Sequence, residues 1–212
     1  MEDAKKTENM GQLAAGGLLS QAFCIAKGFS FEEQHATQVA TIALQIFDEL
    51  KKLHMLDEYD KLLLHIACLL HDIGWIEGQI KHHKISCKLI ISSGLKLPLR
   101  QKIITGLIAR YHRKSLPKAS QKLFAKLDKK EQLKVCWLSA FLRLADGLDR
   151  THNAPVKSIK CKVTKFYIIV YVNASVDSRD DLLVGREKAD LLKLVSKKRA
   201  RLIWRAIPEV GN

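Results

Sequence analysis

The sequence predicts a mainly α-helical protein with a small C-terminal α+β appendage that consists of a β-hairpin and a helix. Apolar residues recur at helical spacing as far as residue 149, and the segments 58–72 and 131–149 are apolar almost all round, which is typical of central helices. After Pro155 apolar and polar residues alternate, which is typical of strands. We therefore place a helical domain at residues 1–154 and the appendage at residues 155–212.

The boundaries of the elements follow from the residues that interrupt the helical period. Helices are expected at about residues 13–25, 31–54, 58–72, 82–93, 98–112 and 131–149. Gly74 is a natural helix terminator, and Pro98 suits a first helical turn. The hairpin is expected at about residues 156–173, and a last, Lys/Arg-rich helix at residues 187–207.

Composition limits the classes of protein and partner. The 212 residues carry a formal net charge of +14, which favours phosphate-rich partners such as a nucleotide, a polyphosphate, nucleic acid or an anionic membrane face, without choosing among them. The five cysteines form no CxxC pair, so neither a zinc ribbon nor a disulfide framework is indicated. With no signal peptide and no apolar run of about 20 residues, we expect a cytoplasmic protein without a membrane span; a homodimer is compatible with these features.

An adjacent histidine and aspartate, His71-Asp72, end a strongly apolar helix. A buried unpaired charge costs several kcal/mol or more, so this pair favours a cation, although an ordinary histidine–aspartate hydrogen bond is an equal alternative for the pair alone. Other candidate ligands lie near the ends of different elements. The whole set is His35, His71, Asp72, His82 or His83, His112 and Asp146. Imidazole with carboxylate suits Mn, Fe, Zn, Co or Ni.

This ordered set resembles the HD superfamily of metal-dependent phosphohydrolases. The spacing of His82, Ser86 and Leu89 is similar to a helix start of that superfamily, which favours His82 over His83. The strings 110–114 and 144–150 resemble more closely the HD-like C-terminal region of the Ppx/GppA exopolyphosphatase family. The resemblance runs from about residue 35 to residue 150 and implies an HD-domain helical bundle. In full-length members the catalytic machinery lies in an actin-like module, whose glycine-rich phosphate loops this sequence lacks.

The leading functional hypothesis is a metal-dependent phosphohydrolase that acts on a phosphorylated small molecule, a nucleotide or a polyphosphate through metal-activated water. One or two divalent ions are expected, with Mn, Fe, Mg, Co, Ni and Zn all open; the ligands are His35, His71, Asp72, His82, His112 and Asp146. Asp72 and Asp149 are assigned to catalysis, although Asp149 is at least as well explained as a carboxylate behind a ligand. The substrate-binding candidates are His83, Arg110, Arg113, Lys114 and Arg150.

Two alternatives stay open. The first is a non-catalytic, regulatory HD-like module that binds polyphosphate or nucleotide. The second, weaker one is nucleic-acid binding through the basic hairpin and last helix, with charge from Lys157, Lys160, Lys162 and Lys165 and aromatic rings from Phe166, Tyr167 and Tyr171, although no nucleic-acid motif is present. Trp75 and His152 are further residues that can approach the site or flank a substrate.

Overall fold

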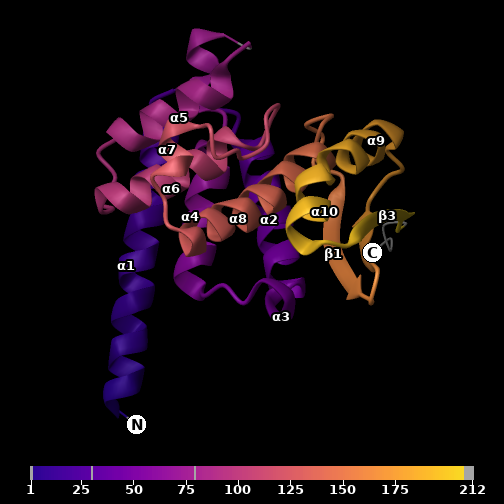
Figure 1. The fold of residues 1–212 in the computed structure, drawn as a ribbon, viewed down its shortest axis with the longest axis horizontal. Coiled ribbons are helices and arrows are strands. Elements are labelled where there is room, and N and C mark those ends of the chain that lie inside the picture. The colour runs from indigo at the N-terminus through magenta and orange to yellow at the C-terminus, as the bar shows by residue number, and fades with distance from the viewer. Residues whose placement is uncertain (1, 30, 79, 208–212) are drawn as a thin grey trace, which may run out of the picture.

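The chain is a helical bundle that carries a three-stranded sheet at one end (Figure 1). The computed structural model describes residues 2–29, 31–78 and 80–207, with side chains from residue 15 onward. The longer helices are α1 (Glu2–Lys27), α2 (Glu33–Glu49), α4 (Glu58–Leu70), α5 (His82–Ser92), α6 (Leu99–Arg110), α8 (Lys129–Leu148), α9 (Arg179–Lys188) and α10 (Asp190–Ser196). Shorter ones are α3 (Lys51–His54), the 3₁₀ helix η1 (Ile73–Glu77) and α7 (Lys122–Ala125). The strands are β1 (Val156–Val163), β2 (Tyr167–Ala174) and β3 (Arg199–Ala206), so the predicted mainly α fold is confirmed.

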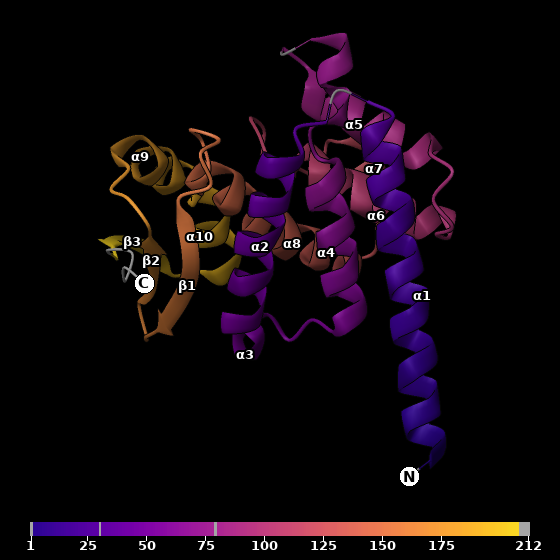
Figure 2. The same ribbon diagram turned by 180° about the vertical axis from the view of Figure 1, so that it is seen from behind.

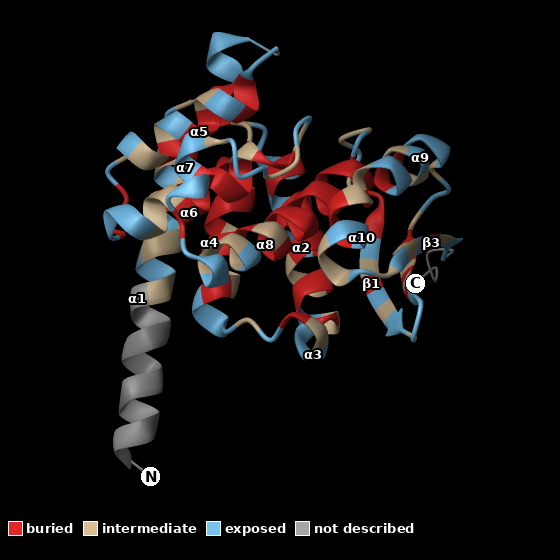
Figure 3. Cartoon of the chain, in the orientation of Figure 1, coloured by how far each residue is buried: buried red, intermediate tan, exposed pale blue. Residues whose placement is uncertain are grey.

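Helix α8 is the centre of the bundle, as its apolar sequence predicts. A capping box begins it, in which Asp128 Oδ1 accepts a hydrogen bond from the Glu131 backbone N–H at 2.8 Å. From Trp137 to Leu148 every residue is buried, and the helix packs against α2, α4 and α6 on one side and against α9 and α10 on the other. Figure 3 shows this buried layer in red through α8, α2 and α4. The residues at the C-terminal end of α8 therefore lie in the interior.

Several helix boundaries differ from the sequence-based expectation. The helix expected at residues 31–54 consists of α2 and the short α3, which ends at Met55 in the left-handed conformation with φ of 57°. The helix expected to reach Asp72 ends at Leu70 and continues as η1. Helix α1 begins at Glu2, well before the expected residue 13, and stands out from the bundle at the end marked N in Figures 1 and 2.

The prediction of one last helix at residues 187–207 is wrong. Strands β1 and β2 form the expected antiparallel hairpin, but α9, α10 and β3 follow it, and β3 pairs in parallel with β2. Lys197, with φ of 56°, ends α10. In β3 the side chains of Ala200, Leu202 and Trp204 alternate with three arginines, which is the period of a strand. The parallel pairing requires a crossover, and α9 with α10 provides it.

The appendage packs directly on the helical bundle. Gln45 Oε1 of α2 accepts a hydrogen bond from the Ile159 backbone N–H at 2.6 Å and thereby covers the free edge of β1. Gly147 of α8 and Gly185 of α9 let these helices approach closely, because a Cβ on Gly147 would lie 3.1 Å from Gly185 Cα. The division into units 1–154 and 155–212 stays a prediction, and residues 1 and 208–212 lie outside the described residues. None of the described helices is long and apolar enough to cross a membrane.

Candidate metal centre

The structure brings together the six side chains that the sequence suggested as metal ligands. His35 comes from α2, His71 and Asp72 follow α4, His82 begins α5, His112 follows α6, and Asp146 belongs to the last turn of α8. Five of them form two groups that share Asp72. His35 and His71 belong to one group and His82 and His112 to the other, and the ligand atoms within each group lie within 4.8 Å of one another. Asp146 Oδ1 lies 3.5 Å from His35 Nε2 and 3.8 Å from His71 Nε2.

Three of the imidazole rings are oriented by hydrogen bonds at Nδ1. The Nδ1 atoms of His71 and His112 each donate to the backbone carbonyl oxygen three residues earlier, at 2.7 and 2.6 Å. His35 Nδ1 lies 2.8 Å from Asp149 Oδ2, which can only accept when ionised. A ring that carries its proton on Nδ1 has its lone pair on Nε2. The buried Nε2 atoms of His35 and His71 make no hydrogen bond. Such an arrangement is typical of histidines that bind a metal.

The spacing of the donor atoms fits a divalent ion. His82 Nε2 lies 3.2 Å from both His112 Nε2 and Asp72 Oδ1, and the third edge, from His112 Nε2 to Asp72 Oδ1, is 3.5 Å. Two donors bound at about 2.0–2.1 Å to one tetrahedral ion are about 3.4 Å apart. The imidazole and carboxylate chemistry is also that of Mn, Fe, Co, Ni and Zn sites. These residues could therefore hold a metal ion.

The electrostatics of the cluster favour positive charge. Burial opposes the charged form of His35, but the neighbouring carboxylates of Asp146 and Asp149 outweigh it and raise the pKa of His35 to about 10, so a bound metal ion would displace a proton from Nε2. Burial likewise opposes the ionised form of Asp72, yet the electrostatic influence of the neighbouring His71 and a hydrogen bond from His82 hold the pKa of Asp72 below its usual value. The carboxylates are therefore ionised and stabilise a cation between them.

Gly74 explains why the segment after Asp72 lies against the start of α5. Its backbone N–H donates to Ser86 Oγ at 2.9 Å. A Cβ at this position would lie 2.3 Å from the backbone oxygen of His82 and 2.6 Å from the Ser86 nitrogen, so no larger residue fits. This close approach of η1 and α5 brings His82 beside Asp72.

A cavity of about 250 Å³ opens beside the cluster. Four of the candidate ligands line it, Asp72, Asp146, His82 and His112, and the rest of its lining is Trp75, Arg113, Arg150, His152, Val184, Glu187 and Lys188. The ring of Trp75 stacks on His82 with centroids 5.0 Å apart, and the ring of His152 stacks on His35 at 3.8 Å. Two of the predicted substrate-binding residues, Arg113 and Arg150, thus lie next to the predicted ligands.

A sequence model of Ppx/GppA phosphatase, domain III, matches residues 21–175. The chain belongs to this family. The match contains all six candidate ligands and ends just after β2, so that α9 and β3 lie beyond the domain III match. No curated protein matches the chain. The resemblance inferred from the ordered histidines and aspartates is therefore confirmed, and the family is one of phosphatases.

The other three predicted substrate-binding residues, His83, Arg110 and Lys114, lie outside the cavity. His83 is buried behind His82, and burial lowers its pKa to about 4. Arg110 does not line the cavity, and its charge contributes to the lowered pKa of His83. Lys114 is exposed and donates to the backbone oxygen of Ile80 at 3.4 Å. Their assignment to the substrate stays a prediction.

Asp149, the second predicted catalytic carboxylate, lies behind His35. It is fully buried and accepts hydrogen bonds from His35 Nδ1 at 2.8 Å and from the Ala154 backbone N–H at 2.9 Å. It does not line the cavity, so both of its oxygens face partners within the protein.

Sequence reasoning missed Lys188 of α9. Its ammonium group forms an ion pair with Asp146 Oδ2, while Asp146 Oδ1 faces His35. Asp181, on the same helix, holds α9 over the end of α8 by accepting hydrogen bonds from the backbone N–H and the hydroxyl of Thr151, at 2.8 and 3.0 Å. No sequence signal marks Lys188, because it lies 42 residues from its partner in a segment rich in lysine and arginine.

Proposed function

We propose that this protein is a metal-dependent phosphohydrolase that acts on a phosphorylated small molecule, a nucleotide or a polyphosphate. The observation that carries the proposal is the convergence of oriented imidazole Nε2 atoms on the carboxylates of Asp72 and Asp146, next to a cavity with cationic walls. A purely structural core gains nothing from such a cluster, because unpaired buried polar atoms cost free energy. The family, one of phosphatases, supports the same reaction class.

The six candidate ligands would hold one or two divalent ions. The identity of the metal stays open among Mn, Fe, Mg, Co, Ni and Zn. Asp72 belongs to both groups, so its carboxylate could contribute a ligand to either one. When bound, such an ion supplies Lewis acidity, which makes water a better nucleophile near neutral pH and draws charge from a phosphoryl group. Asp149 then acts as a positioning residue, since it keeps the proton of His35 on Nδ1 and leaves Nε2 to bind.

Cationic side chains on the cavity wall would bind the phosphate. Arg113 and Arg150 offer guanidinium groups, which bind phosphate oxygens in pairs, and Lys188 offers a point charge. The volume of about 250 Å³ is small for a whole nucleotide and suits a terminal phosphoryl group. A neighbouring cavity of about 620 Å³ shares Arg150, His152 and Val184 with it and could take the rest of a longer substrate.

Metal content and phosphate release, measured on the same samples, test the proposal. Protein purified without chelator is compared with the double variant His71→Ala/Asp72→Ala on a panel of nucleotides, phosphomonoesters and polyphosphate. His65→Ala, on the same helix α4, is the matched control. We expect one to two equivalents of a transition metal and phosphate release in the wild type and the control, and the loss of both in the double variant. Equal metal content and equal activity in all three proteins would refute the proposal.

The alternative is a regulatory module that binds the same ligands without hydrolysing them. Lys188 favours it, because its ammonium group pairs with Asp146 at the place where a cation would be expected. The matched region is also one domain of the phosphatase family. The same panel separates the two functions, since a binding module would take up metal and bind polyphosphate or nucleotide without releasing phosphate.

A further inference from the structure

The three-stranded sheet has a basic and aromatic face that lies apart from the metal centre. Alternate side chains point away from the core, and we call this side the outer face. It is defined by Lys162 of β1, Tyr167 and Tyr171 of β2, and Arg199, Arg201 and Arg205 of β3. Tyr171 is partly exposed and the other five are exposed. The opposite side of the sheet packs on α9, where a Cβ on Gly185 would lie 3.2 Å from Leu202.

The pairing of the strands places these side chains side by side on one surface. Tyr167 pairs with Arg199, and Ile169 lies between Lys162 on one neighbouring strand and Arg201 on the other. Tyr171 pairs with Lys160 of β1 and with Ile203 of β3, so each of the two tyrosines has a paired cation on one edge strand.

The charge of the sheet has one sign. Residues 156–174 contain four lysines and residues 199–206 three arginines, and neither segment contains an aspartate or glutamate. Glu49 of α2 reaches the edge of β1 and pairs with Lys160 at 3.0 Å. Lys160 lies on the same side of the sheet, opposite Tyr171, but for the four cations that define the outer face no carboxylate partner occurs among the residues that the structure describes. Such a surface attracts a polyanion.

The aromatic rings add a second recognition element. The guanidinium carbon of Arg205 lies 4.2 Å from the centroid of the Tyr171 ring, and that of Arg199 lies 6.0 Å from the Tyr167 ring. Phe166, in the turn before β2, is 63% exposed. Unpaired bases stack on aromatic rings and on guanidinium planes of this kind, whereas inorganic polyphosphate has no group that stacks.

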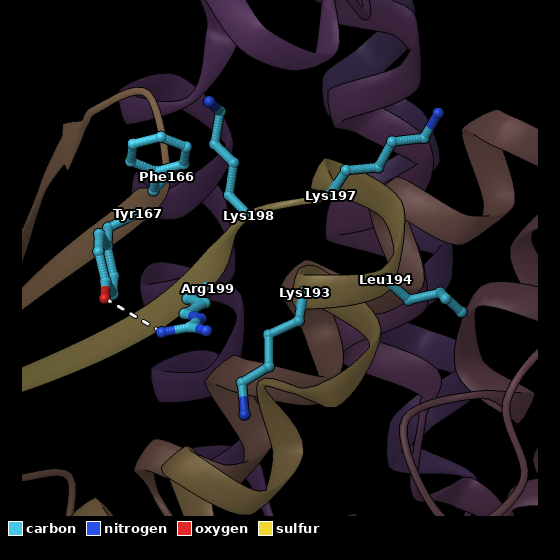
Figure 4. Close-up of a pocket in the computed structure, with 7 residues that line it drawn as sticks. All are labelled: Phe166, Tyr167, Lys193, Leu194, Lys197, Lys198 and Arg199. Atoms are coloured by element: carbon cyan, nitrogen blue, oxygen red, sulfur yellow. Dashed lines mark hydrogen bonds between the residues drawn. The ribbon is translucent and has the colours of Figure 1, made fainter.

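A shallow cavity of about 720 Å³ extends the outer face at the end where β2 and β3 begin (Figure 4). Phe166 and Tyr167 lie on one side of it, and Lys193 and Lys197 of the α10 segment on the other. Lys198 holds the turn that carries Phe166 by donating to two backbone oxygens of that turn, each at 2.8 Å. The cavity is large enough for a nucleoside.

We propose that the outer face binds single-stranded nucleic acid, with backbone phosphates on the cations of β1 and β3 and unpaired bases stacked on Tyr171, Tyr167 and Phe166. This cavity and the cavity of the candidate metal centre share no residue, so the proposal does not depend on phosphohydrolase activity. Charge and stacking come from different side chains, so substitutions can remove either one without the other.

Fluorescence anisotropy of the full chain with a labelled single-stranded RNA of about 12 nucleotides, a typical site size, measures the binding. Tyr171→Val removes the ring and keeps a residue suited to a strand, and we expect binding to weaken at least about fivefold. Tyr171→Phe keeps the ring and should bind as the wild type does. Tyr59→Val, at an exposed tyrosine of α4, is the matched control. Tyr167→Val replaces Tyr171→Val if circular dichroism shows that the latter is not folded.

The charge is tested with a triple change of the β3 arginines, Arg199→Gln/Arg201→Gln/Arg205→Gln. Its control, Lys126→Gln/Lys129→Gln/Lys130→Gln, removes the same charge from exposed positions in and just before the first turn of α8. Loss of three phosphate contacts should make the negative slope of log affinity against log salt concentration shallower by about 2, and the control should keep the slope of the wild type. Two results would overturn the proposal: unchanged binding by the ring-deleted variant, or polyphosphate of equal phosphate number competing as well as the RNA.

Discussion

The hydrogen bond between His35 and Asp149 leads to a sharp prediction for Asp149→Asn. Asp149 accepts from His35 Nδ1 through Oδ2 and from the Ala154 backbone N–H through Oδ1. An asparagine has one acceptor oxygen and one donor group, so it can serve only one of these donors. If its oxygen faces Ala154, its amide donates to His35, and the histidine proton moves to Nε2, where it blocks metal binding.

The magnitude follows from the role of such partners in metal sites. Loss of the group that orients a metal-binding histidine typically lowers metal affinity 10- to 100-fold, which is about 1.4–2.7 kcal/mol. We expect this loss for Asp149→Asn in a competitive titration of Mn or Zn against a chromophoric chelator. Asp48→Asn, at the exposed carboxylate that pairs with Lys61, should leave the affinity unchanged.

The same variant distinguishes positioning from catalysis. If Asp149 acts only through His35, an excess of metal should restore the rate of phosphate release at saturating substrate. If Asp149→Asn binds metal within twofold of the wild type and yet stays inactive at saturating metal, the positioning argument is refuted, and Asp149 acts in the chemical step.

Three further predictions concern the surroundings of the site. Gly74→Ala places a Cβ 2.3 Å from a backbone oxygen of α5 and should lower the free energy of unfolding in urea by about 1–3 kcal/mol or more, whereas Gly94→Ala, with open space around it, should change it little. Lys188→Met removes the ammonium paired with Asp146, so metal should bind more tightly and the KM for a phosphorylated substrate should rise; weaker metal binding would contradict this. Burial lowers the pKa of His54 in the folded state, so as the pH falls the unfolded state is protonated at a higher pH than the folded state. The free energy of unfolding should therefore fall as the pH drops below about 6.5, by up to about 1.4 kcal/mol per pH unit from this group. Thermal unfolding at a series of pH values checks this, and an equally steep fall in His54→Gln would exclude this group as the cause.

The sequence by itself determined the helical core and the chemistry of the site. The nearly all-apolar segments 58–72 and 131–149 predict central helices, because a helix that is apolar all round is stable only when it is buried. The His71-Asp72 pair and the later histidines and aspartate predict a metal cluster, because their donor types and their order are local properties of the chain. Gly74 was visible as a helix terminator, although its close contact with α5 was not.

Only the tertiary structure decided which partners these residues meet. The last segment was predicted as a helix because its lysines and arginines suit an exposed helix face, yet β3 forms because β2 offers it a free edge. Lys188 reaches Asp146 only through the close packing of α8 and α9, and Asp149 lies behind His35 only because α2 meets the end of α8. A hydrophobic period records which side of an element is buried, whereas the partner on that side depends on contacts between segments far apart in the chain.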